Sequence, residues 1–260
     1  MVAFPKPEPG TCVSFATTRH HTSRTPVTHD ADAIRSFFDQ WDLYRRIIEH
    51  DYMFHRGLHG AMHAFLAQRV PPGYRLLDLG CGDALVMAGT VAGTGVGEYV
   101  GVDLSPVALE HAARNLAAVS VPASFAAEDF ITCLEATPDA AFDVVAAGFT
   151  VHHLRGADLE RFFREARRVL KPAGHLLVYD VFRAEGESRE SYLIRNHSWR
   201  EQTWHTMSKE ELDSIWGHTS TADFPSSPSE LAFVAIAAGL RSDPDELFVS
   251  PVGFHRLYAW

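Results

Sequence analysis

The sequence predicts an α/β fold in which a mostly parallel sheet carries helices on both faces. Short apolar runs alternate with helical segments from residue 75 to residue 182, and a glycine-rich turn follows the first run. Such alternation is typical of parallel sheets, because each crossover to the next parallel strand needs a helix. With 46% hydrophobic residues, the 260-residue chain can build one sizeable core.

The predicted elements follow one another with short connections. Strands are expected at residues 75–79, 99–102, 123–127, 142–147, 175–182, 246–249 and 254–259. Helices are expected at residues 54–69, 84–92, 106–118, 158–170 and 229–238. Ser105 is a typical N-cap for the third helix, with Pro106 at its first position. On the fourth helix Arg161, Arg164, Arg167 and Arg168 lie opposite the apolar face, so we expect that arginine face to be solvated.

We expect one domain over residues 30–260, preceded by a mobile tail at 1–29 that lacks an apolar period. Residues 30–72 should hold N-terminal helices. Their apolar side chains recur every three or four residues, at Phe37, Phe38, Trp41, Tyr44, Ile47 and Ile48. After a core at 73–183, residues 184–228 interrupt the alternation and should form one or two helices over the carboxyl edge of the sheet. A helix and a strand hairpin complete the chain at 229–260.

The composition excludes several classes of protein. The net charge of −10 disfavours binding to nucleic acid, which requires positive charge against phosphates. No apolar run approaches membrane-spanning length, and the N-terminus has no apolar signal core. Three scattered cysteines fit a reducing compartment. We therefore expect a cytoplasmic protein that binds neither nucleic acid nor membranes.

A glycine-rich turn and a carboxylate predict a site for a nucleotide-like ligand. Gly80 and Gly82 follow the first strand, where the missing Cβ atoms let a ligand approach the backbone. Asp103 comes about twenty residues later, at the end of the second strand, where a carboxylate can accept both hydroxyls of a ribose. The alternative role for Asp103 is that of a strand-end cap.

Five stretches carry these residues in a characteristic order. They are Leu76-Leu77-Asp78-Leu79-Gly80-Cys81-Gly82-Asp83-Ala84, Val100-Gly101-Val102-Asp103-Leu104-Ser105, Ala127-Glu128-Asp129-Phe130, Phe142-Asp143-Val144-Val145 with Thr150-Val151-His152-His153-Leu154, and Arg168-Val169-Leu170-Lys171-Pro172-Ala173-Gly174-His175. Together they resemble the motifs of the class I S-adenosylmethionine-dependent methyltransferases. The resemblance covers residues 76–182. It implies a Rossmann-like sheet of seven strands with the last strand antiparallel, S-adenosyl-L-methionine as cofactor, and S-adenosyl-L-homocysteine as product.

The resemblance also implies a set of cofactor-binding residues. They are Arg56, Asp78, Gly80, Cys81, Gly82, Asp103, Leu104, Glu128, Asp129, Phe130, Gly148 and Phe149. Asp78 would face the amino group of the cofactor, Asp103 its ribose, and Asp129 its adenine. Asp129 has the alternative role of a helix N-cap. Arg56 would pair with the cofactor carboxylate, or else is a solvated or structural arginine.

Three histidines are candidates for catalysis. Methyl transfer to a hydroxyl or an acidic carbon needs a base, and histidine titrates near neutrality. His152 and His153 follow the fourth strand, at the sheet edge where ligands of such folds bind. His205 lies in the insert, beside Trp204, which could form an aromatic wall. The alternative is that all three serve shape and packing.

The sequence gives no complete metal site. His55, His59 and His63 are spaced by four on one helical face, which can bind zinc. No carboxylate or cysteine completes the set, so we predict no metal and expect this helix to line the rim of the pocket.

Other classes of protein carry motifs similar to these. A nicotinamide-dependent dehydrogenase would need a third glycine where Leu85 stands. An aminopropyl transferase would need acidic diamine-binding residues after the fourth strand. A non-catalytic cofactor-binding subunit, and oxygen, nitrogen or carbon as acceptor atom, all stay open. We expect a small-molecule acceptor, with a hydroxyl as the first choice, and the sequence leaves a homodimer open.

Overall fold

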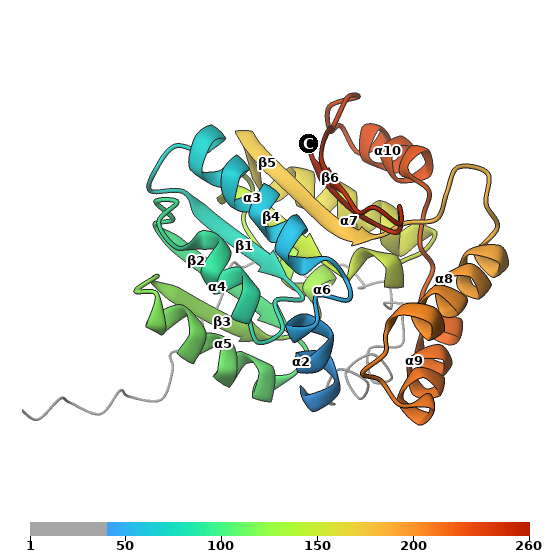
Figure 1. Ribbon diagram of the computed structural model, residues 1–260. Helices are drawn as coiled ribbons and strands as arrows, with labels where there is room; N and C mark the ends of the chain where they lie inside the picture. The colour runs from blue at the N-terminus through green and yellow to red at the C-terminus, as the bar shows by residue number, and fades with distance from the viewer. Residues whose placement is uncertain (1–40) are drawn as a thin grey trace, which may run out of the picture.

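The computed structural model describes residues 41–260, which form a seven-stranded sheet between two layers of helices (Figure 1). The predicted tail at 1–29 and the residues Phe37 and Phe38 lie outside the described part. In chain order the elements are α2 (Trp41–Glu49), α3 (His55–Arg69), β1 (Arg75–Leu79), α4 (Leu85–Val91), β2 (Glu98–Asp103), α5 (Pro106–Ala118), β3 (Ala123–Ala127), α6 (Phe130–Ala136), β4 (Phe142–Gly148), η1 (Val151–His153), α7 (Ala157–Val169), β5 (Leu170–Val181), α8 (Arg189–Thr203), α9 (Lys209–Ala222), α10 (Pro228–Ala237), β6 (Asp245–Val249) and β7 (His255–Ala259).

The sheet has the strand order β3-β2-β1-β4-β5-β7-β6. The first five strands in this order pair in parallel, and β7 runs antiparallel to both β5 and β6. This arrangement confirms the predicted Rossmann-like fold with an antiparallel last strand. The order reverses between β1 and β4, and ligands of open α/β sheets bind at such a point.

Alternation along the strands gives the sheet two apolar faces. Leu76, Tyr99 and Val144 lie on the face covered by α3, α4 and α5. Leu77 and Val145 lie on the face covered by α6, α7 and α10. Successive strand side chains point to opposite faces, so buried strands of this kind are apolar almost throughout.

A helical cap stands beyond the carboxyl ends of β4 and β5 (Figure 1). It consists of α2, α8 and α9, joined by a small apolar cluster in which Leu43 and Ile47 pack with Trp204 and Met207. Ser208 begins α9 with a reciprocal capping box to Glu211. The insert predicted to hold one or two helices therefore holds two. None of the helices within residues 41–260 is long and apolar enough to cross a membrane.

Three details differ from the sequence-based expectations. Helix α6 was expected only in the alternative in which Asp129 is an N-cap, because its seven residues are too few for a period to be visible. Strand β5 begins at Leu170, since the Lys171–Gly174 stretch continues as extended chain. The arginine face of α7 is only partly solvated: Arg161 is buried against Asp158 and Glu135. Arg168 pairs with Glu165 and donates to the carbonyls of Leu134 and Thr137 at the end of α6.

Candidate active site

An open cavity lies at the carboxyl ends of β1, β2 and β4. Its volume is about 1100 Å³ with the open mouth included, which is ample for a cofactor and a small acceptor. The residues that line it come from the ends of β2, β4 and β5, from the turns after β1 and β3, and from α2, α3, α4, α6 and η1. They are Tyr44, Ile48, His55, His59, Gly80, Cys81, Gly82, Asp83, Ala84, Leu85, Val86, Met87, Val102, Asp103, Leu104, Ser105, Glu128, Phe130, Gly148, Phe149, Thr150, His153 and Tyr179.

The turn after β1 brings bare backbone to this cavity. Gly80 and Gly82 have positive φ angles of 70° and 53°, which glycine adopts without strain. A Cβ atom on Gly80 would overlap the side chain of Thr150, whereas one on Gly82 would meet no atom within 4 Å. The N–H groups of Gly80 and Cys81 donate to the carbonyl of Val102 at 2.8 and 3.0 Å. The turn is thus fixed to β2, and the space over Gly82 stays free for a ligand.

Asp103 stands at the end of β2 and lines the cavity beside Leu104. Its Oδ2 accepts from the N–H of Gly82 at 2.8 Å, and its Oδ1 accepts from the N–H of Ser105 at 2.9 Å. Asp103 therefore does cap the turn, as the alternative interpretation held. A carboxylate oxygen can accept more than one hydrogen bond, so the same group can also hold a ribose.

Asp78 lies beneath the turn instead of in the cavity wall. It is 1% exposed, and its Oδ2 accepts from the hydroxyl of Tyr99 at 2.5 Å. Its Oδ1 has no hydrogen-bond partner among the described residues. Burial, together with the nearby charge of Asp103, raises the pKa of Asp78 to about 7. The position facing a cofactor amino group, which the resemblance implies either directly or through water, would need a bridging water or a shift of the turn.

Neighbouring residues in the turn after β3 have different roles. Asp129 is the N-cap of α6 and accepts from the N–H of Thr132 at 3.0 Å. It does not line the cavity, whereas Glu128 and Phe130 do. The capping alternative is therefore realised in the structure through one carboxylate oxygen, and the contact of Asp129 with adenine stays a prediction.

Two predicted site residues lie away from the cavity. Arg56 is exposed, and its guanidinium donates to the carbonyl of Glu49 at 3.1 Å. His205 is exposed in the connection between α8 and α9. Its neighbour Trp204 is buried against Tyr52, with ring centroids 4.9 Å apart, and forms no cavity wall. Neither residue lines the cavity, so the roles of Arg56 in cofactor binding and of His205 in catalysis stay predictions that this arrangement does not support.

The turn after β4 closes the cavity with aromatic rings. A Cβ atom on Gly148 would overlap the ring of Tyr179, so only glycine lets β5 present that ring here. Phe149 has a positive φ of 50°, an unfavourable conformation for a residue with a bulky side chain. Its N–H donates to the carbonyl of Tyr179 at 2.9 Å, which helps to hold that conformation.

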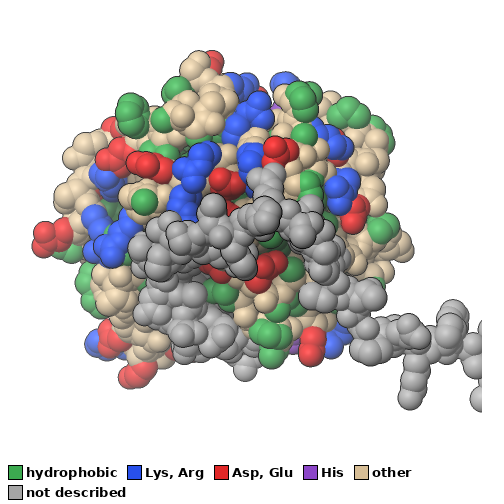
Figure 2. Space-filling model, turned by 180° about the vertical axis from the view of Figure 1, so that it is seen from behind, with side chains coloured by type: hydrophobic (Ala, Val, Ile, Leu, Met, Phe, Trp, Pro, Cys, Tyr) green, Lys and Arg blue, Asp and Glu red, His purple; other side chains and the backbone are tan. Residues whose placement is uncertain are grey.

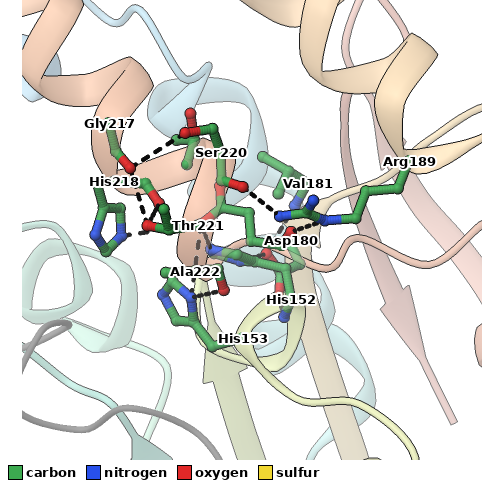
Figure 3. A network of polar contacts seen from close by, with 12 residues as sticks. His152, His153, Asp180, Val181, Arg189, Gly217, His218, Ser220, Thr221 and Ala222 are labelled. Atoms are coloured by element: carbon green, nitrogen blue, oxygen red, sulfur yellow. Dashed lines mark hydrogen bonds and ion pairs between the residues drawn. The ribbon is translucent and has the colours of Figure 1, made fainter.

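His152 and His153 follow on η1 and have different surroundings (Figure 3). His153 lines the cavity, whereas His152 lies behind it, with Nδ1 2.5 Å from Oδ1 of Asp180. Burial would lower the pKa of His152, but the carboxylates of Asp180 and Asp223 raise it to about 10. Burial and the charge of His152 lower the pKa of His153 to about 3. Of these two histidines, only His153 is neutral at neutral pH and in contact with the cavity.

Helix α3 supplies two further histidines to the wall. His55 and His59 line the cavity, and burial lowers their pKa values to about 4 and about 3. His59 and His63 both turn toward Thr90, each with Nδ1 2.8 Å from an oxygen of that residue. The three histidines therefore do not converge on one point, and α3 lines the rim as expected.

A comparison with known families decides the class of the domain. Residues 77–178 match the family described as "Methyltransferase domain". Residues 77–178 are thus similar to a methyltransferase domain, and the fold agrees with those of S-adenosylmethionine-dependent methyltransferases from Leishmania major and Archaeoglobus fulgidus. The matched residues run from β1 into β5 and include the glycine turn, Asp103 and the histidine pair.

Relatives of the methyltransferase domain act on different substrates, as their names state. The ribosomal protein L11 methyltransferase of Ralstonia pickettii is 34% identical over 123 residues, which is 47% of this chain and 37% of that protein. The phosphoethanolamine N-methyltransferase of Triticum aestivum is 32% identical over 124 residues, 46% of this chain and 23% of that protein. The chain thus spans less than half the length of these relatives. A methyltransferase structure from Leishmania major shares the fold, with a TM-score of 0.60, 16% identity and coverage of 90% and 86% of the two chains.

The cavity of the methyltransferase domain fits the family's cofactor. The open space over Gly82 is a cradle that any larger side chain would fill. Asp83, Asp103 and Glu128 line the same side, and carboxylates suit a cofactor that carries a sulfonium and an ammonium group. Thr150 adds a buried hydroxyl without a hydrogen-bond partner in the part of the chain that the structure describes.

Some cavity residues carried no signal in the sequence. Asp83 and Thr150 stand inside recognised motifs, but only the fold shows that they face the ligand space. Tyr179 and Asp180 end an apolar strand, and the rule that ligands meet the carboxyl ends of strands could have indicated them. Asp223 follows a helix in the insert, so nothing in the sequence places it beside His152.

We predict that Asp78 makes the stability of the domain depend on pH. Its pKa rises from 3.8 to about 7 on folding, so the folded chain holds a proton that the unfolded chain loses between these values. The free energy of unfolding therefore falls as pH rises through that window. Asp78→Asn removes the cost of ionising this buried carboxyl. The free energy of unfolding of the variant, relative to that of the wild type, should therefore rise by about 2 to 3 kcal/mol from about pH 5 to about pH 8.

Urea denaturation at the two pH values measures this difference. The exposed Asp243→Asn variant is the matched control, for which the difference from the wild type should stay constant. A constant difference for Asp78→Asn as well would contradict the assignment.

Proposed function

We propose that the methyltransferase domain transfers the methyl group of S-adenosyl-L-methionine to a hydroxyl of a small-molecule acceptor. The observation that carries the proposal is the continuity of the cavity. It runs from the glycine turn and Asp103 to a wall of aromatic rings from Tyr44, His55, Phe149 and Tyr179. The cofactor brings a methyl group that is already electrophilic, so the protein has mainly to place the acceptor in line with it.

The acceptor side of the cavity contains polar atoms that have no hydrogen-bond partner among the described residues. Both ring nitrogens of His55 are buried and make no hydrogen bond to any described residue. A buried polar group without a partner costs stability, and a bound acceptor with hydroxyl groups would remove that cost. The aromatic rings beside His55 supply apolar contact; the ring of Phe149 lies 5.3 Å from it between centroids.

His153 is the better placed of the two predicted bases. It lines the cavity and stays neutral at neutral pH, as a proton acceptor must. His152 is protonated at neutral pH because its pKa is about 10, so it cannot take a proton from the acceptor. We assign His152 the role of holding η1 against Asp180, which positions His153 at the cavity wall.

The surroundings of the cavity favour a small acceptor. The helices of the cap cover the carboxyl edge of the sheet (Figure 1). On the face drawn in Figure 2, basic and acidic side chains alternate over the described surface, without one extended basic field that would suit nucleic acid. A protein substrate, as the name of the Ralstonia relative states for that enzyme, would need a more open approach to His153.

The decisive test combines a binding titration with a turnover assay. Calorimetry with S-adenosyl-L-homocysteine should show one site per chain. Incubation with S-adenosyl-L-methionine and panels of phenols, alcohols, amines and acidic carbon compounds should give a methylated hydroxyl product. Binding without any product would favour the non-catalytic alternative, and a methylated amine or carbon would correct the acceptor class.

Asp103 provides a second test through cofactor affinity. Asp103→Ala should weaken binding of S-adenosyl-L-homocysteine by about 1 to 3 kcal/mol, because a charge-assisted contact is lost. Asp103→Asn keeps the shape and should lose part of that amount. Glu110→Gln, an exposed change on α5, is the control. Unchanged affinity in Asp103→Ala calorimetry would refute the ribose assignment.

His153 is tested through the catalytic rate. We expect His153→Gln to lower kcat by about a hundredfold or more, the usual contribution of a general base, with the affinity for S-adenosyl-L-homocysteine unchanged. His111→Gln, an exposed histidine on α5, serves as the control and should keep the wild-type rate. A kcat within a few-fold of the wild type would mean that His153 only shapes the cavity.

A further inference from the structure

A buried carboxylate oxygen stands among three imidazoles at the junction of η1 and α9. Asp223 is 4% exposed, and its Oδ1 makes no hydrogen bond within the described residues. Nε2 of His152 lies 3.5 Å from this oxygen, Nδ1 of His153 3.6 Å and Nε2 of His218 3.8 Å. These separations are too long for good hydrogen bonds, yet three nitrogen atoms surround the oxygen closely.

The separations match those between ligands of one metal ion. Bonds of about 2.0 to 2.2 Å in a tetrahedral site place neighbouring ligand atoms about 3.4 Å apart. The ligand atoms of His152, His153 and Asp223 all lie within 4.8 Å of one another. A small movement of side chains would therefore bring all three into coordination.

Asp180 holds the first histidine as metal-binding histidines are usually held. Its carboxylate contacts Nδ1 of His152 at 2.5 Å and also accepts from the N–H groups of His152 and Val181 at 3.0 and 2.7 Å. Figure 3 shows Asp180 beside His152, with His153 and Ala222 nearby. A carboxylate on the far ring nitrogen fixes the tautomer and leaves Nε2 free to bind a metal.

We propose that His152, His153 and Asp223 bind a divalent transition-metal ion of the zinc and iron(II) class. Two imidazoles and one carboxylate are the ligands such ions prefer, whereas magnesium and calcium prefer oxygen ligands throughout. The dication would also balance the buried carboxylates of Asp180 and Asp223. His218 is near enough to be a fourth ligand or to hold a bound water.

Binding requires two local changes. His153 must give up the contact of its Nδ1 with the carbonyl of Ala222, which measures 3.1 Å. His152 must give up a proton, since its pKa is about 10 in the metal-free site. Both costs are ordinary for metal sites, where ligands lose protons on binding.

The site would connect the cap to the cavity. His153 lines the cavity, while His152 and Asp223 lie behind it, so an open coordination position could face the acceptor. This clause alone rests on the proposed function: with the metal bound, His153 would be a ligand instead of the base, and a hydroxyl bound to the metal would ionise more readily. The proposed metal site itself rests on the positions of the side chains of His152, His153, His218 and Asp223.

Cobalt(II) binding to the full chain, prepared without a histidine tag, tests the proposal independently of turnover. We expect one equivalent of cobalt(II) to give the visible bands of a low-coordinate nitrogen and oxygen site. Zinc should displace it and a large excess of magnesium should not. Absence of these bands in the folded wild type would overturn the proposal, whether or not the protein transfers methyl groups.

Variants separate a metal site from a purely structural network of ion pairs. Asp223→Asn and His153→Gln should each abolish the bands. Asp180→Asn should weaken the affinity for cobalt(II) about 10- to 100-fold, because Asp180 orients the ligand His152. His111→Gln should bind as the wild type does, with circular dichroism as the check on folding. If a ligand variant does not fold, carbethoxylation of the wild-type histidines with and without zinc replaces it. Equal cobalt binding by the folded ligand variants, or labelling that zinc does not change, would refute the site.

Discussion

The close approach of two turns at the point where the strand order reverses determines the rest of the site. Gly80 after β1 lies against Thr150 after β4, and Gly148 lies against the ring of Tyr179 on β5. Neither contact tolerates a Cβ atom. Because these side chains lie directly against glycine backbone, one crevice can present the ligand space over Gly82 and, a few residues past β4, the histidines of η1.

Burial then sets the chemical character of each polar group around the crevice. Burial lowers the pKa values of His55, His59 and His153 and keeps these imidazoles neutral. His152 differs because two carboxylates face it, and their attraction outweighs the cost of burial. At neutral pH His152 is therefore protonated, whereas the adjacent His153 is neutral. Different surroundings commonly give residues of the same type different protonation states in this way.

The sequence predicted those parts of the molecule whose signals are local. The glycine turn, the spacing to Asp103, the N-cap at Ser105 and the alternation of strands and helices all depend on near neighbours, and all are present. The sequence did not indicate that Arg56 and His205 are exposed away from the cavity, because the direction of a helix or loop side chain depends on packing between elements. Asp129 was ambiguous for a different reason, since one carboxylate can serve a helix cap or a ligand equally well.

The junction between η1 and α9 joins acceptor choice to chemistry. The N–H of Phe224 donates to the carbonyl of His152, and Arg189 donates to the carbonyls of Ser220 and Asp223. The insert therefore also sets where the histidine pair stands. If the insert selects the acceptor, as we propose, a foreign insert grafted onto this core would displace the histidine pair as well.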